Sequence, residues 1–313
     1  MARRAEAEHP VNEADQAFTL HVANQIAEWE NAHGALPGLR DPAARDSFVR
    51  QLVESDRRRR YVELLAARAR ARPGRDEIDS AFNPLVTAAR HAQAGNTDEG
   101  LWLVFLAVHF GRHRVAGWRY TGAVYGKLGD GRWDWPAVST DPTEFRAWLS
   151  ANRNQVEGTG RHGFGNHRKR ESLGDDGTGR VVQSYVDWIG PTRSPVTAFE
   201  AITADASDDR AIAFDLLYES MGAVYRFGRL GRFDYLTTAG RLGLINSLPG
   251  RPYLPSSSGP LKGARLLFGA AHPRDLEATT TRFGAAVGIS FPVLEDALCN
   301  WQKSPTSFRR WTG

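Results

Sequence analysis

Residues 101–110, LWLVFLAVHF, constrain the fold most because they are apolar on every side. This run is about half the ~20 residues that a helix needs to cross a membrane, so we expect it inside a folded core. Periodicity alone also allows a buried strand. The four residues before it, Asn96 to Glu99, combine a capping residue with first-turn acids and favour a helix over 98–110.

Helical spacing of apolar residues recurs along the chain and predicts an all-α fold. One stripe lies within 18–29, and the cleanest comprises Phe214, Leu217, Tyr218, Met221, Val224 and Tyr225. Further helices are expected from Asp46 to about residue 72, from Asp141, over 181–190 and over 292–303, whereas 174–180, GDDGTGR, read as an exposed turn. The sequence contains no run of strand-like alternation. We divide it into an N-terminal helical segment, 1–95, that packs on a core, 96–313.

The composition limits the classes of protein to which the chain can belong but does not select one of them. Forty Lys and Arg against 36 Asp and Glu give a net charge of +4, which permits nucleic-acid binding but does not require it. Most of these cations are arginines, which suit phosphate contacts, although a GC-rich genome also explains them. The single cysteine, Cys299, excludes an internal disulfide and a cysteine-based metal cluster. We therefore expect a cytoplasmic protein without metal or cofactor, and the N-terminus lacks the apolar core of a signal peptide.

Two basic segments with glycine are candidates for contact with DNA. In 109–120, HFGRHRVAGWRY, the candidates are Arg112, His113, Arg114 and Trp118, because arginines beside aromatics hold phosphates and stack on bases. The alternative is a helix end whose cations complement the helix dipole. In 161–170, RHGFGNHRKR, the glycines let backbone approach a ligand, and a solvated basic loop is the alternative. The candidates in this second segment are Asn166, His167, Arg168 and Lys169.

A third segment, 226–236 (RFGRLGRFDYL), places Arg229, Arg232 and Asp234 among aromatics and glycines. A helix-hairpin-helix turn aims backbone N–H groups at a DNA phosphate in a similar way. Gly228 and Gly231 are spaced one residue wider than in that pattern, so the match is weak by itself.

A fourth segment, 293–304 (VLEDALCNWQKS), brings acids, amides and a lysine onto one short helix. Asp296, Asn300 and Lys303 share one face, beside the face with Glu295 and Cys299. A carboxylate with a lysine can activate water, stabilise an oxocarbenium ion or form a Schiff base. An ordinary intrahelical ion pair is the alternative.

Taken in order, several of these segments resemble the α-glutamyl/putrescinyl thymine pyrophosphorylase family, and its third clade in particular. The resemblance spans roughly residues 45–310 and rests on LWLVFLAVHFGRHR, GWR, VYGKLG, GFGNHRKRESL, SYVDWIG, FGRLGRFDYL and LEDALCNWQK. The family is similar to a divergent branch of the helix-hairpin-helix DNA glycosylases. The resemblance therefore implies two helical lobes with DNA in the cleft between them and the target base flipped out of the stack.

The resemblance also implies a carboxylate, and here the sequence departs from the glycosylase pattern. In those enzymes an essential aspartate follows the hairpin by about a helix length. That region reads YLPSSSGPLKGAR here, without an acid, so the role falls to Asp234 or Asp296. Lys303 then pairs with the carboxylate or forms a Schiff base. The cysteine-ligated iron–sulfur cluster of some glycosylases is not expected.

Three functions follow from this reading. The first is a DNA N-glycosylase that excises a modified base, such as glucosylated hydroxymethylcytosine, from phage DNA in antiviral defence. The second is a transferase that replaces pyrophosphate on a hydroxymethyl-pyrimidine with an amino acid or polyamine. The third is a non-catalytic protein that binds modified DNA. The expected partner is double-stranded DNA with modified bases, bound by a monomer, and a helical protein without a role on DNA is the remaining alternative.

Overall fold

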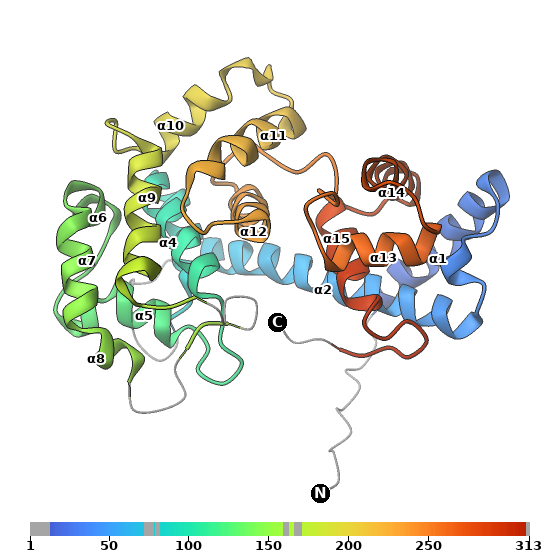
Figure 1. Cartoon of the computed structure of the whole chain (residues 1–313), viewed down its shortest axis with the longest axis horizontal. Helices are drawn as coiled ribbons and strands as arrows, with labels where there is room; N and C mark the ends of the chain where they lie inside the picture. The colour runs from blue at the N-terminus through green and yellow to red at the C-terminus, as the bar shows by residue number, and fades with distance from the viewer. Residues whose placement is uncertain (1–12, 72–77, 79–81, 159–162, 166–170, 311–313) are drawn as a thin grey trace, which may run out of the picture. The chain divides into compact units, whose positions relative to one another are not determined.

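The structure is a computed structural model that describes residues 13–71, 78, 82–158, 163–165 and 171–310. These residues form α-helices with short 3-10 or π turns, and none of them belongs to a strand, which confirms the all-α prediction. The chain separates into two compact units (Figure 1), one made of Met1–Arg59 with Arg251–Trp311 and the other of Arg60–Gly250. The glycosylase-like arrangement of two lobes stays a prediction.

The first unit joins the two ends of the chain around one apolar core. It contains α1 (Glu13–His33), most of α2 (Pro42–Ala71), α13 (Gly259–Phe268), α14 (Pro273–Val287) and α15 (Phe291–Trp301). The predicted stripe of α1 is buried through Val22, Ile26 and Trp29, and Trp29 meets Phe283 of α14 edge to face. Burial of such side chains contributes ~1.5–3 kcal/mol each.

The second unit is built around α4 (Thr97–Phe110), whose side chains are buried on nearly every side, as expected. Around it pack α3 (Pro84–Gln93), α5 (Arg119–Tyr125), α6 (Trp135–Thr140), α10 (Pro195–Ile202) and α12 (Arg229–Arg241). The remaining helices of this unit are α7 (Pro142–Ala151), α8 (Arg153–Glu157), α9 (Arg180–Ile189) and α11 (Arg210–Ser220). The predicted boundary at 95/96 stays a prediction, and α3 and α4 pack together across it.

The acidic first turn of α4 ties neighbouring helices to it. Asp98 accepts hydrogen bonds from the backbone N–H of Val196 (2.8 Å) and from the Ser194 hydroxyl (3.2 Å) at the start of α10. Glu99 accepts from the backbone N–H of Trp135 at the start of α6 (2.7 Å). Each carboxylate thus satisfies donors of another helix N-terminus, where negative charge is stabilising. Asn96 starts the helix as predicted, but its side chain makes no capping bond.

Two local predictions are wrong. Residues 174–180 are not an exposed turn: Asp175–Gly179 form a π turn in which Gly177, Thr178 and Gly179 are buried. A side chain at Gly177 would collide with the backbone of Ser172, so the turn closes by a local backbone contact that requires glycine. The stripe over 214–225 is buried as far as Val224, but α11 ends at Ser220 and a 3-10 turn, Met221–Ala223, follows.

Candidate nucleic-acid interface

The loop after α4 is a tight turn that projects arginines. His113 and Gly117 exchange backbone hydrogen bonds of 2.9 Å in both directions. The ring Nδ1 of His113 accepts from the backbone N–H of Ala116 at 2.9 Å, which leaves Nε2 of the neutral ring to carry the proton. Arg112 and Arg114 are exposed, and Val115 at the tip is 55% exposed. His113, which was predicted as a contact with DNA, thus shapes the turn.

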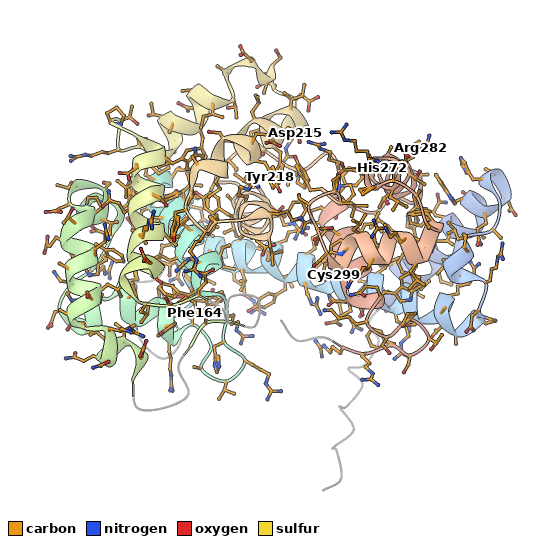
Figure 2. The ribbon with its side chains drawn as sticks, in the orientation of Figure 1. Phe164, Asp215, Tyr218, His272, Arg282 and Cys299 are labelled. Carbon is orange, nitrogen blue, oxygen red and sulfur yellow. The ribbon has the colours of Figure 1, made fainter. Side chains whose placement is uncertain are left out.

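The second basic segment meets this loop. The backbone N–H of Gly165 donates to the carbonyl of Phe110 at 2.7 Å. Phe164 (Figure 2) packs edge to face on the rings of His109 and Tyr120, with centroids 5.8 and 5.1 Å away. The structure therefore brings two of the predicted segments together at the end of α4. Four of the predicted contacts in the second segment lie outside the described residues: Asn166, His167, Arg168 and Lys169.

A buried hydrogen-bond relay that sequence reasoning missed supports this junction. His109 is 2% exposed, and its Nε2 lies 2.8 Å from the hydroxyl of Thr178. That hydroxyl donates to the carbonyl of Ser172 at 3.0 Å, so it accepts from His109, and Nε2 carries the proton. The relay links the end of α4 to the segment that follows the second basic loop. A threonine between two glycines gave no signal of burial.

The third segment packs against the same central helix, but its arginines contact protein. The ring of Phe227 stacks on Phe105 of α4, with centroids 4.9 Å apart. Arg232 lies over the ring of Tyr218 at 4.3 Å and donates to the Tyr218 carbonyl at 2.9 Å, which completes the C-terminal end of α11. Arg229 lies 5.1 Å over Phe233.

Two carboxylates of the second unit lie near these segments. Asp234 is half-buried on α12, between buried neighbours, and was predicted as a candidate. Glu171 was missed by sequence reasoning. It is 15% exposed, and its Oε2 atom is buried without a hydrogen-bond partner in the described structure. The Nε atom of Arg226, in the third segment, lies 3.7 Å from it.

The fourth segment lies in the other unit, on and just after α15. The Oδ2 atom of Asp296 accepts from the Ser55 hydroxyl and from Arg58, both at 2.7 Å, and Oδ1 accepts from Asn300 at 2.8 Å. Lys303 donates to the amide oxygen of Asn300 at 2.8 Å. The predicted shared face of Asp296, Asn300 and Lys303 is confirmed. The lysine reaches the carboxylate through the amide rather than directly.

A cavity of about 850 Å³ opens beside the arginine loop, within the second unit. It is lined by three arginines and by three aromatic residues: Arg112, Arg119, Arg132, Tyr61, Phe82 and Trp118. Arg112 and Trp118, two of the residues predicted to contact DNA, thus line the same cavity. Among the described residues that line it, three are arginines and none is acidic.

Neither a metal centre nor a membrane span emerges from the described residues. No three His, Cys, Asp or Glu side chains gather there as a metal would require. No helix in that part of the chain has the length and apolar character needed to cross a membrane.

Comparison with known proteins gives one match. The family model described as α-glutamyl/putrescinyl thymine pyrophosphorylase clade 3 matches residues 43–313, which include all four segments. No curated protein matches the chain, and no solved structure does. The family is a DNA-modification pyrophosphorylase clade. The chain belongs to the α-glutamyl/putrescinyl thymine pyrophosphorylase family, clade 3.

Proposed function

We propose that the protein is a DNA N-glycosylase that excises a modified base, such as glucosylated hydroxymethylcytosine, from phage DNA in antiviral defence. One observation carries the proposal. Two glycine- and arginine-bearing segments, distant in sequence, join at the end of α4 through Phe164 and Gly165, beside exposed Arg112 and Arg114. Exposed arginines on a fixed turn suit the phosphates that flank an extruded nucleotide. Membership of a DNA-modification family supports DNA as the partner.

The chemistry needs a carboxylate close to the sugar. As the N-glycosidic bond breaks, its electron pair leaves with the base and positive charge develops on the sugar; water then adds to C1′ and loses a proton. We assign the carboxylate to Asp234, because it is half-buried in the unit that carries the arginine loop. Asp296 already accepts from three donors of its own unit, which suits a structural role.

The test follows the released base. Purified protein is incubated with unmodified, hydroxymethylated and glucosylated DNA, and released bases are identified by mass spectrometry. We expect a modified base together with alkali-labile DNA. Asp234→Asn is expected to abolish release while DNA binding persists, and Asp296→Asn to lower stability with release retained. If no DNA loses a base, the glycosylase proposal fails, and binding without product would favour a non-catalytic reader of modified DNA.

The family name favours a second candidate, a transferase. In that reaction an amine nitrogen forms a bond to the hydroxymethyl carbon of the pyrimidine. The C–O bond to pyrophosphate breaks, its electron pair leaves with pyrophosphate, and the amine loses a proton. Incubation of DNA that bears a pyrophosphorylated hydroxymethyl-pyrimidine with putrescine distinguishes the two. Release of pyrophosphate with a mass gain on the base supports the transferase, whereas an abasic site supports the glycosylase.

A further inference from the structure

We infer that the cavity beside the arginine loop binds a nucleotide, a flat base carrying phosphate, with Trp118 as its stacking surface. The inference rests on the proposed function only for the source of that nucleotide, which is either a DNA strand or the free pool. The volume of about 850 Å³ lies within the ~300–1,000 Å³ typical of small-molecule pockets.

Trp118 stands apart from the other tryptophans. In the described part of the chain, every other tryptophan ring contacts a neighbouring aromatic ring, through partners such as Phe283, Phe48 and Trp133. No ring contact among the described residues includes Trp118, which is half-buried and lines the cavity. Tyr61, also in the wall, is 47% exposed. Ring faces of this kind stack on bases whatever their sequence.

The charges of the cavity fit a phosphate. Arg112 and Arg119 have no ion-pair partner among the described residues, and Arg132 joins them in the wall. Guanidinium groups hold phosphate oxygens through paired N–H donors, which a neutral ligand would leave unused. Aromatic faces and cations in one wall therefore favour a ligand with both a ring and a negative charge.

Glycines keep the cavity open. Gly117, Gly129 and Gly131 line it with φ angles of +61°, +103° and +115°, and no atom lies within 4 Å of where a side chain would begin. L residues with side chains rarely adopt such φ values. At these three positions the backbone conformation favours glycine, and a side chain would enter open space.

The test is binding to the intact protein in the absence of DNA. Titration calorimetry compares dTMP with thymidine, which lacks the phosphate, and with inorganic pyrophosphate, which lacks the ring. We expect dTMP to bind more tightly than either. Trp118→Ala should weaken dTMP binding about tenfold, consistent with the stacking free energy per base, and Trp118→Phe should retain most of the affinity.

Arginine variants separate the charge from the ring. Replacing Arg119 and Arg132 together by Ala should weaken dTMP but not thymidine. Arg180→Ala, an exposed arginine on α9 that does not line the cavity, is the matched control and should bind as the wild type does. A short oligothymidylate that displaces dTMP would assign the site to a DNA strand, whereas persistence of bound dTMP would assign it to free nucleotide.

Two results would overturn the inference: dTMP that binds no better than thymidine, or a Trp118→Ala protein that binds dTMP as tightly as the wild type. Circular dichroism of each variant checks that it is folded. Since neither measurement uses DNA cleavage, a protein that binds dTMP but releases no base would refute the proposed glycosylase and leave the nucleotide site intact.

Discussion

Glu99, in the first turn of α4, is expected to make the stability of the protein depend on pH. The residue is 3% exposed, and burial raises the pKa of its carboxyl group from the ordinary 4.5 to about 7. Hydrogen bonds from Trp135 and Tyr125 oppose the rise but do not cancel it. Between these two pH values the folded protein therefore holds a proton that the unfolded chain has released.

The size of the effect follows from linkage. Each unit of pKa difference is worth about 1.4 kcal/mol, so the free energy of unfolding should fall by roughly 3 kcal/mol as the pH rises through this window. The contribution is fully present below pH 4.5 and is lost above pH 7. The sign is that of a group whose pKa is higher in the folded state, because the unfolded chain binds fewer protons there.

Glu99→Gln removes the titration and keeps the contacts. The amide oxygen can accept from the Trp135 N–H, and the amide NH₂ can donate to the Tyr125 hydroxyl. Urea unfolding followed by circular dichroism from pH 4.5 to 8 gives the free energies. The variant should gain on the wild type by roughly 3 kcal/mol across this range. Glu200→Gln, an exposed change on α10, should gain nothing. A constant difference between Glu99→Gln and the wild type would refute the burial argument.

Three further changes test other contacts. Thr178→Val should cost about 1–3 kcal/mol in thermal unfolding because it leaves His109 without its hydroxyl acceptor, and Thr178→Ser should restore most of that loss. Gly165→Ala puts a methyl group 2.9 Å from the Gly111 carbonyl carbon, so it should separate the two loops and weaken DNA binding in a gel-shift assay; unchanged binding would argue against the joint interface. Gly263→Ala drives α13 into the backbone of α15 and should destabilise the first unit by at least about 1–3 kcal/mol in urea unfolding, an effect absent if the helices separate freely.

The periodicity of apolar residues predicted most of the helical fold. The run over 101–110 allowed a central helix or a buried strand, and the capping residue and acids before it favoured the helix that α4 forms. The apolar stripe of α1 likewise predicted a face that packs on a core. The burial of Thr178 was not predictable, because its hydroxyl meets His109, which lies 69 residues earlier in the chain, and nothing local encodes that contact. A local sequence pattern gives the type of a residue but does not identify the residues that it packs against.

The candidate site also contains residues that the sequence pattern identified and residues that it did not. Arg112 and Trp118 were found from their types and spacing, and they do line one cavity. Arg232 has the same local signature, yet it serves the end of α11, because a cation beside an aromatic suits a helix carbonyl as well as a phosphate. Glu171 carried no distinguishing pattern, and only the burial of its Oε2 atom marks it.

The division of the chain into units has a consequence for its biosynthesis. The second unit, Arg60–Gly250, is one continuous stretch, whereas the first needs Arg251–Trp311 to complete it. As the ribosome releases the chain from its N-terminus, α1 and the start of α2 emerge long before α15, which supplies Trp301 as the ring partner of Phe48. The apolar faces of α1 and α2 therefore stay exposed while the whole second unit is synthesised, and exposed apolar surface promotes aggregation. We therefore expect the first unit to complete its folding slowly and to depend on chaperones more than the second unit does.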